Sequence, residues 1–211
     1  MKTRIFILLF SLGMVSLVQA GEPKNGGKIK VKQDAYVECG ESSVKTMGST
    51  QSNKLRVGNV KKENKYSRRT YLKFSMKNID GLDNANFIVL HVYGKAFSKQ
   101  TDKNAIIDVH TVLSNKWNEE SITWKKAPQV GGKIGTFEVT QKGEQGGWAW
   151  YTVSIPAIEI KELIIDSGKK QEFSIALQSV ADRPVTSEFY SKERTSKNGN
   201  ITKNGAYITL K

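Results

Sequence analysis

The chain has 211 residues, of which 33 are Lys or Arg and 20 are Asp or Glu, so its net charge at neutral pH is +13. This length suits one domain or two small ones and excludes a multidomain enzyme. Beyond its N-terminal stretch the chain has no long apolar run, which excludes a polytopic membrane protein. Cys39 is the only cysteine, which excludes a disulfide-stapled scaffold.

Residues 1–20 are predicted to be a signal peptide that is cleaved after Ala20. Lys2 and Arg4 form its charged start, an apolar stretch follows, and Val18 and Ala20 supply small residues before the cleavage point. The apolar stretch is shorter than the roughly 20 residues of a membrane span, so no stable membrane insertion is expected. Removing Lys2 and Arg4 lowers the net charge from +13 to +11. The mature chain is therefore expected to be a basic secreted or periplasmic protein.

Residues 21–33 are polar and are predicted to be a flexible lead-in to a single domain over residues 34–211. Short alternating or compact apolar segments, separated by Gly, Asn, Asp and Ser, predict strands of a sandwich or barrel. These strands are Ala35–Glu38, Lys54–Gly58, Thr70–Met76, Asn86–Tyr93, Ile106–Val112, Thr136–Thr140, Trp148–Ile155, Glu172–Gln178, Ser187–Ser191 and Ala206–Leu210. Apolar residues at helical spacing over Pro156–Ile165 predict one short helix. We expect an all-β fold with at most this one helix.

Alternation along the predicted strands indicates which side chains share a face. Leu72 and Phe74 would point inward from one strand, and Leu55 and Val57 from the strand before it. If both strands belong to one sheet, their outward side chains and the adjoining loop form a basic patch beside an aromatic ring. The side chains of this predicted patch are Lys54, Arg56, Arg68, Arg69, Tyr71 and Lys73.

A series of short motifs runs through the predicted domain. In chain order they are Asp34-Ala35-Tyr36-Val37, Leu55-Arg56-Val57-Gly58, Arg69-Thr70-Tyr71-Leu72-Lys73-Phe74, Trp117-Asn118-Glu119-Glu120-Ser121-Ile122-Thr123-Trp124, Ala127-Pro128, Tyr151-Thr152-Val153 and Phe189-Tyr190-Ser191-Lys192-Glu193. This order resembles the DNRLRE-domain family, which includes carbohydrate-binding modules of the family-96 type. The resemblance implies a jelly-roll β-sandwich, secreted or on the cell surface, and often attached to polysaccharide-degrading enzymes. Characterised modules of this type recognise alginate, an acidic uronate polymer.

The charge and the resemblance together favour a non-catalytic module that binds an acidic polysaccharide, either an alginate-like uronate or a glycosaminoglycan. A basic protein attracts polyanions, and no nucleic-acid-binding motif is present. Arg and Lys would pair with carboxylates or sulfates, while Trp150 and Tyr190 are candidates for stacking on sugar rings. The alternatives are a solvated basic surface and buried aromatic rings. A separate polysaccharide-degrading enzyme is a candidate partner.

Two other functions compete with this interpretation. A small polysaccharide lyase acting by β-elimination on a uronate polymer needs proton-transfer groups and a cation near the carboxylate. The candidates for these roles are His91, His110, Tyr93 and Arg69. A structural role in a surface or matrix assembly is the second alternative. No Cys/His cluster or calcium motif is found, so no metal site or cofactor is predicted, although calcium is compatible with jelly-roll loops.

Overall fold

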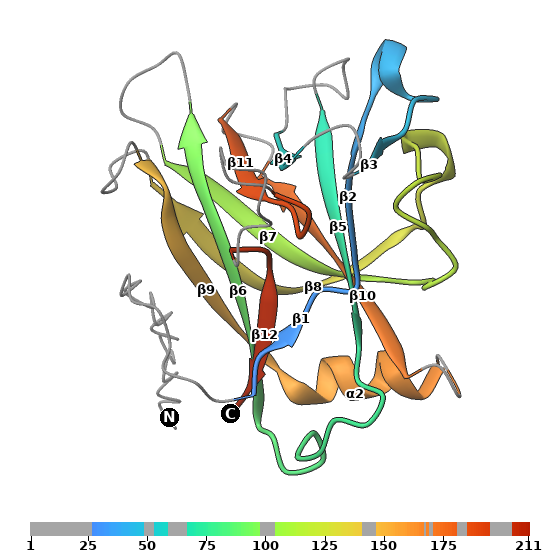
Figure 1. Cartoon of the computed structure of the whole chain (residues 1–211), viewed down its shortest axis with the longest axis vertical. Helices are drawn as coiled ribbons and strands as arrows, with labels where there is room; N and C mark the ends of the chain where they lie inside the picture. The colour runs from blue at the N-terminus through green and yellow to red at the C-terminus, as the bar shows by residue number, and fades with distance from the viewer. Residues whose placement is uncertain are drawn as a thin grey trace, which may run out of the picture.

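A computed structural model describes residues 27–48, 53–58, 67–97, 104–140, 147–166, 168, 171–180, 185–194 and 204–211. The described chain folds into two packed β-sheets with a helix at one end (Figure 1). The predicted signal peptide, with its cleavage point after Ala20, lies outside the described residues.

The first sheet is built around its longest strand, β6 (Phe87–Phe97), and is called the β6 sheet here. Strand β9 pairs with one edge of β6, while β12 and β11 pair with successive halves of the other edge. β1 continues the sheet from β12, and β4 continues it from β11. The other strands are β1 (Ile29–Lys30), β4 (Lys54–Val57), β9 (Ala149–Pro156), β11 (Thr186–Tyr190) and β12 (Tyr207–Leu210).

The second sheet contains β5 (Arg68–Ser75) and is called the β5 sheet. Its strands lie in the order β3-β2-β5-β10-β7-β8, and every described pairing is antiparallel. The other members are β2 (Gln33–Glu38), β3 (Met47–Gly48), β7 (Ala105–Val112), β8 (Val130–Val139) and β10 (Glu172–Ser179). An isolated bridge between Gly58 and Arg68 joins the end of β4 to the start of β5 and so connects the two sheets at one corner.

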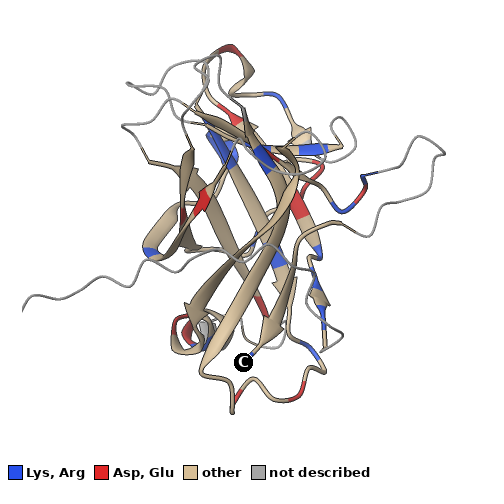
Figure 2. Cartoon of the chain, turned by 90° about the vertical axis from the view of Figure 1, so that its left-hand side faces the viewer, with Lys and Arg blue, Asp and Glu red and all other residues tan. Residues whose placement is uncertain are grey.

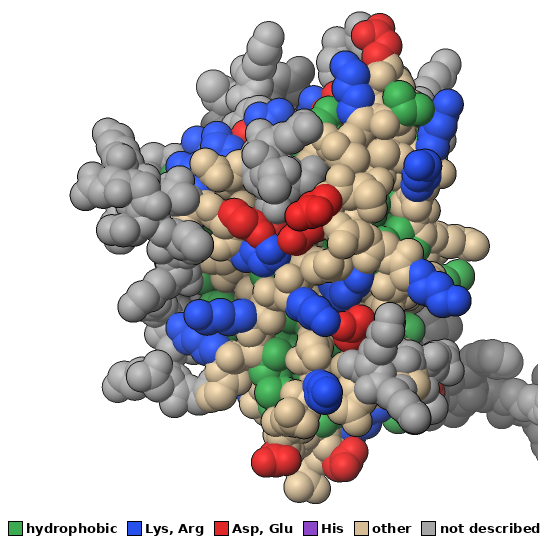
Figure 3. Space-filling view, turned by 45° about the vertical axis from the view of Figure 1, so that its right-hand side comes forward, with side chains coloured by type: hydrophobic (Ala, Val, Ile, Leu, Met, Phe, Trp, Pro, Cys, Tyr) green, Lys and Arg blue, Asp and Glu red, His purple; other side chains and the backbone are tan. Residues whose placement is uncertain are grey.

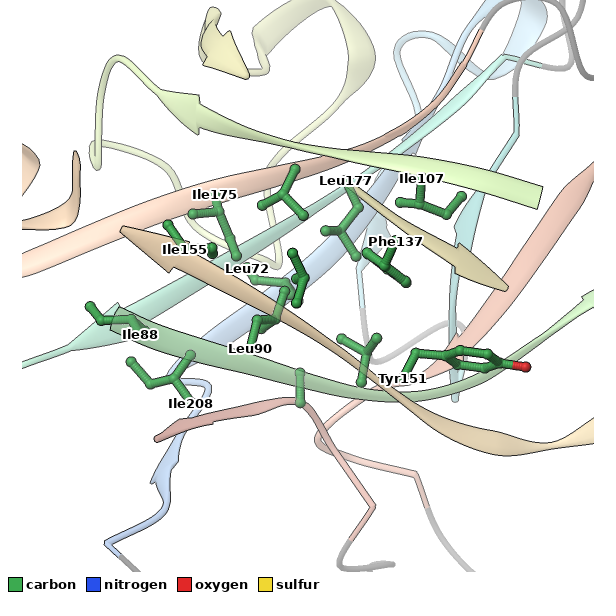
Figure 4. Packing of buried hydrophobic residues seen from close by; sticks show 14 of the residues in the cluster. Leu72, Ile88, Leu90, Ile107, Phe137, Tyr151, Ile155, Ile175, Leu177 and Ile208 are labelled. Atoms are coloured by element: carbon green, nitrogen blue, oxygen red, sulfur yellow. The ribbon is translucent and has the colours of Figure 1, made fainter. Parts of the chain in front are cut away.

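Apolar side chains from alternate positions of both sheets fill the space between them. The labelled side chains in Figure 4 come from both layers, among them Leu72, Ile175 and Leu177 from the β5 sheet and Leu90 and Ile155 from the β6 sheet. Each of these five side chains has at most 1% of its surface exposed. Their burial removes a large apolar area from water, which is the main force holding the two layers together.

Helix α2 (Ala157–Asp166) closes one end of the sandwich, where Figure 1 shows it running across the ends of the strands. Ala157 and Ile160 belong to the main core, and Leu163 and Ile164 pack against it. The helix predicted over Pro156–Ile165 is thereby confirmed. Within the described ranges, no helix has the length and apolar character needed to cross a membrane.

A long connection between β7 and β8, residues 113–129, covers the outer face of the β5 sheet. Figure 1 shows it on the right of the molecule, outside β5 and β10. Its Trp117 and Ile122 form a second apolar cluster with Ala35, Tyr71 and Ala176 of the sheet beneath. The indole Nε1 of Trp117 also donates a hydrogen bond to Ser174 Oγ at 3.0 Å. This outer face is therefore a second core and not a solvated surface.

The all-β sandwich predicted from the sequence is confirmed, and each predicted strand is present. Most strand ends lie within two residues of the prediction, but β6 extends four residues further and β8 begins six residues earlier. The structure adds β1 and β3, each of two residues. β1 lies inside residues 21–33, which the sequence predicted as a flexible lead-in, so the β-structure begins before Asp34. Segments this short cannot show alternation, which explains why the sequence did not reveal them.

Candidate functional site

The basic patch predicted from β4 and β5 does not form, because the two strands belong to different sheets. β4 pairs with β11, and Arg56 lies opposite Glu188 in that pairing. β5 lies between β2 and β10 in the other sheet. Figure 2 shows Lys and Arg positions on the strands of both layers, and in the space-filling view of Figure 3 atoms of other residues lie between many of the basic side chains. The prediction of one shared basic face was therefore wrong.

Tyr71 and Lys73 were predicted to be exposed, and the structure corrects this expectation. Their exposed fractions are 0% and 4%, because the 113–129 connection covers them. The Tyr71 hydroxyl donates to the carbonyl of Pro128 at 3.0 Å. The Lys73 ammonium donates to the Trp117 carbonyl at 2.5 Å and to Gln33 Oε1 at 2.7 Å. Both side chains hold the connection onto the sheet and are inaccessible to a polymer.

The four remaining cations of the predicted patch make contacts within the protein. Arg68 Nε donates to Glu38 Oε2 at 2.7 Å, and the Arg69 guanidinium lies over the ring of Trp124. On the other sheet, Glu188 is paired with Lys54 Nζ at 2.8 Å and with Arg56 Nε at 3.3 Å. Glu188 is itself only 5% exposed, so these two cations neutralise a nearly buried carboxylate.

The two histidines proposed for a lyase lie on different sheets. His91 is on β6, whereas His110 is on β7, and its ring Nδ1 lies 3.2 Å from the Gly131 carbonyl of the neighbouring strand β8. His91 is 4% exposed and stacks on Tyr207 with a centroid distance of 4.4 Å. Burial, with the nearby charges of Lys211 and Lys28, lowers the pKa of His91 to about 4. Because proton transfer needs groups within hydrogen-bonding reach of the substrate, this arrangement does not assemble the predicted lyase set.

The outer face of the β6 sheet instead carries a cluster of aromatic rings, which we call the aromatic platform. Tyr93 on β6 lies directly opposite Trp150 on β9, and their ring centroids are 5.3 Å apart. On its other side Tyr93 meets Tyr190 of β11 edge-on at 5.1 Å. Alternation along the strands directs these rings outward, away from the main core. The platform consists of Tyr93, Trp148, Trp150, Tyr190 and Tyr207.

Trp148 and Tyr207 extend the platform in two directions. Trp148 lies 4.4 Å from Tyr190 and stacks at 5.9 Å on Tyr93. Tyr207 meets Trp150 edge-on at 5.3 Å. Tyr207 is buried, whereas the other four members are half-buried and keep part of their surface in water. Amphipathic rings grouped in this way are suited to binding ligands that have both apolar and polar surfaces.

Three cations each lie over a ring of the platform, and we call them the basic rim. Lys28 Nζ is 4.6 Å from the centroid of the Tyr207 ring. Lys95 Nζ is 5.1 Å from the Trp148 ring, and the Arg194 guanidinium is 4.6 Å from the Tyr190 ring. These distances are within the range of cation–π attraction. The rim therefore places positive charge at several positions around the exposed aromatic surface.

The hydroxyl of Tyr93 remains protonated at neutral pH. Burial, followed by the neighbouring Tyr190, raises its pKa above the ordinary value of 10.0. A neutral phenol offers both a donor and an acceptor next to the apolar rings. The center of the platform can thus form hydrogen bonds with hydroxyl groups as well as stacking contacts.

Sequence reasoning found part of this site. Trp150 and Tyr190 were predicted to stack on sugar rings, and Tyr93 was a candidate for a lyase site. The structure brings these three side chains together on one face. Trp148, Tyr207 and the three rim cations were missed. Lys95 could have been predicted to share a face with His91 and Tyr93, because it continues their alternation along the strand. It was missed because the strand was predicted to end at Tyr93. The convergence of the rings depends on the pairing of β6 with β9 and β11, which one strand does not reveal.

Comparison with known proteins points to a carbohydrate-binding family. A search of curated proteins found no match to the chain. The sequence model of carbohydrate-binding module family 96 matches residues 27–202, which is most of the chain. This match confirms the family-96 part of the resemblance noted above, while the DNRLRE part stays a prediction. The chain belongs to carbohydrate-binding module family 96.

Proposed function

We propose that the protein binds an acidic polysaccharide across the aromatic platform and its basic rim. Carbohydrate binding is the property of the family. The acidic nature of the ligand and the position of the binding face are what we propose here. The observation that carries the proposal is the placement of Lys28, Lys95 and Arg194, each over an aromatic ring of one sheet face. Sugar rings present apolar C–H faces that can stack on Trp and Tyr, and their carboxylates or sulfates can pair with the rim.

The pairing of the cations supports an acidic ligand. Among the described residues, no carboxylate lies within salt-bridge distance of Lys28, Lys95 or Arg194. Lys54 and Arg56 on the same sheet are instead paired with Glu188. The rim can therefore pair with a ligand without first breaking an ion pair of the protein, which lowers the cost of binding.

The ligand chemistry is a repeating sugar chain that carries carboxylates or sulfates, such as an alginate-like uronate or a glycosaminoglycan. A secreted or periplasmic protein, as the N-terminal segment predicts, would meet such polymers outside the cytoplasm. A polysaccharide-degrading enzyme acting on the same polymer would be its functional partner. No contact among the residues that the structure describes favours a lyase or a matrix role, so we propose neither.

The first test compares Trp150→Ala with Phe87→Ala by affinity gel electrophoresis and calorimetry on alginate and heparin. Phe87 is a matched control because it is 47% exposed on β6, six positions from Tyr93, or roughly 20 Å along the strand. We expect Trp150→Ala to weaken binding about tenfold or more, as loss of a central aromatic anchor does. Phe87→Ala should bind like the wild type. Equal retention of all three folded proteins, or equal binding to a neutral cellulose derivative, would refute the proposal.

A second test addresses the rim. Lys95→Gln removes a rim charge, and Lys77→Gln removes a charge from an exposed turn elsewhere. Charge pairing near a surface is screened by salt, so wild-type affinity should fall steeply between about 50 and 500 mM NaCl. Lys95→Gln should bind more weakly at low salt and show a smaller salt dependence, whereas Lys77→Gln should match the wild type. Affinity that does not change with salt would rule out ion pairing as the basis of recognition.

A further inference from the structure

Three carboxylates from separate parts of the chain meet at one point, which we call the acidic trio. Asp34 lies on β2, Glu119 lies in the 113–129 connection, and Glu193 lies in the turn that follows β11. One carboxylate oxygen from each residue lies within 4.8 Å of the other two. Asp34 is fully buried, while the side chains of Glu119 and Glu193 are 16% and 31% exposed. The trio is therefore a partly covered site with access to solvent.

Several oxygens of the trio already accept hydrogen bonds. The Lys192 amide donates to Asp34 Oδ2 at 2.8 Å, and the Asp34 amide donates to Glu119 Oε2 at 3.0 Å. The Lys192 ammonium donates to Glu119 Oε1 at 2.9 Å and also to Glu193 Oε1. Two further oxygens, Asp34 Oδ1 and Glu193 Oε2, are buried and accept no hydrogen bond from the described residues. An unsatisfied buried carboxylate oxygen is costly and calls for a positive partner.

Lys192 does not balance the charge of the trio by itself. Three carboxyl groups meet one ammonium group, so the acidic groups of the cluster outnumber the basic one. The site therefore retains negative charge that a divalent cation would neutralise.

We propose that Asp34, Glu119 and Glu193 form a calcium-binding site. Calcium prefers carboxylate oxygens at 2.3–2.6 Å, so oxygens on opposite sides of the ion lie up to about 5 Å apart, as they do here. It accepts an irregular set of 6–8 ligands, which suits oxygens already oriented by other hydrogen bonds. Bidentate carboxylates and water from the exposed side would complete the shell. Magnesium requires shorter bonds in a near-ideal octahedron and fits this set less well.

The bound ion would join three segments that are distant in the sequence. The 113–129 connection covers the β5 sheet, and Glu119 would tie it to β2. Glu193 immediately precedes Arg194, whose guanidinium lies over the ring of Tyr190 in the aromatic platform. Arg194 is further held by a hydrogen bond from its amide to the Ser191 carbonyl at 3.2 Å. Calcium would thus stabilise both the covered face and the turn that carries one cation of the rim.

The test measures cation binding without any polysaccharide, so its result is separate from that of the proposed function. The EDTA-treated full chain is titrated with CaCl₂ and MgCl₂ by calorimetry, and its thermal unfolding is followed with and without calcium. Glu193→Gln removes a ligand charge while keeping the shape of the side chain. Glu162→Gln, on an exposed position of α2, is the matched control. Terbium emission excited through tryptophan provides a second readout, since Trp117 lies two residues before Glu119.

We expect one calcium per chain, a higher melting temperature with calcium, and terbium emission that calcium displaces. Glu193→Gln should weaken calcium binding about tenfold or more and lose the displaceable emission, while Glu162→Gln should behave like the wild type. A wild-type chain with neither calcium heat nor displaceable emission would overturn the proposal. Unchanged calcium affinity in Glu193→Gln would do the same, and magnesium binding as tight as calcium would overturn the choice of ion.

Discussion

His91 should make the protein less stable in mild acid. Its ring is 4% exposed, stacks on Tyr207 and lies within 3.1 Å of Thr209 Oγ1. Burial, then the charges of Lys211 and Lys28, lower its pKa from 6.5 to about 4. Because the folded pKa lies below the unfolded value, the unfolded chain binds more protons between these two values. The free energy of unfolding must therefore fall as the pH falls from about 6.5 to about 4.

The size of this loss follows from the two pKa values. With 6.5 in the unfolded chain and about 4 in the folded protein, linkage gives a loss of about 2 kcal/mol at pH 5 and about 3 kcal/mol at pH 4. A loss of about 3 kcal/mol is a substantial part of the 5–15 kcal/mol that stabilises a typical domain. Most of the effect should appear within a range of two pH units.

Urea unfolding of the wild type and of His91→Gln between pH 7 and pH 4 measures the effect. Glutamine can bond Thr209 but cannot be protonated, so the stability difference between the two proteins should shift by about 3 kcal/mol over this range. Asp34 contributes with the opposite sign, since its folded pKa of about 7 lies above the unfolded value, but both proteins contain it. Parallel stability curves for the two proteins would show that His91 is not the buried neutral group described here.

Two substitutions test the packing around each sheet face. Gly94→Ala would place a Cβ 2.6 Å from the Glu188 carbonyl oxygen and against the Phe189 ring. The free energy of unfolding, measured with urea, should therefore fall by about 1–3 kcal/mol. An unchanged midpoint would contradict this close approach of β6 and β11. Trp117→Phe removes the buried bond to Ser174 and weakens the contact with the Lys73 ammonium, and we expect a loss of about 2 kcal/mol by the same assay. A loss below about 0.5 kcal/mol would show that the 113–129 connection contributes little to stability.

The strands could be predicted from the sequence because the burial of their side chains alternates with period two. β7 is an example, with Ala105, Ile107 and Val109 buried and the residues between them partly exposed. The same pattern correctly separated Leu72 from Tyr71 on the two faces of β5. Whether a face meets water was a different question, because the answer depends on what a distant segment covers. Tyr71 was expected to be exposed, and the 113–129 connection buries it.

The sheet to which each strand belongs was the second feature that could not be predicted from the sequence. Lys54 and Arg56 were placed beside Arg69 because their strands follow each other along the chain. The chain instead crosses from one layer to the other between β4 and β5, near the bridge of Gly58 and Arg68. Hydrogen-bond pairing between β4 and β11 depends on a contact more than a hundred residues apart, and no local pattern specifies it. The acidic trio was missed for the same reason, since its members come from three distant segments.

The outer faces of the two sheets differ in the polarity of their side chains, and this difference supports the proposed binding face. Ala35 and Ala176 on the β5 sheet are apolar without a polar edge, and Trp117 covers them. Tyr93 and Trp150 on the β6 sheet combine apolar rings with a hydroxyl and an indole N–H, so they tolerate contact with water. Their spacing is fixed by a paired sheet register, which leaves little conformational freedom to lose when a ligand stacks on them. With Tyr190 beside Tyr93, the row of rings crosses β9, β6 and β11, and we therefore expect a bound polysaccharide to run across these strands.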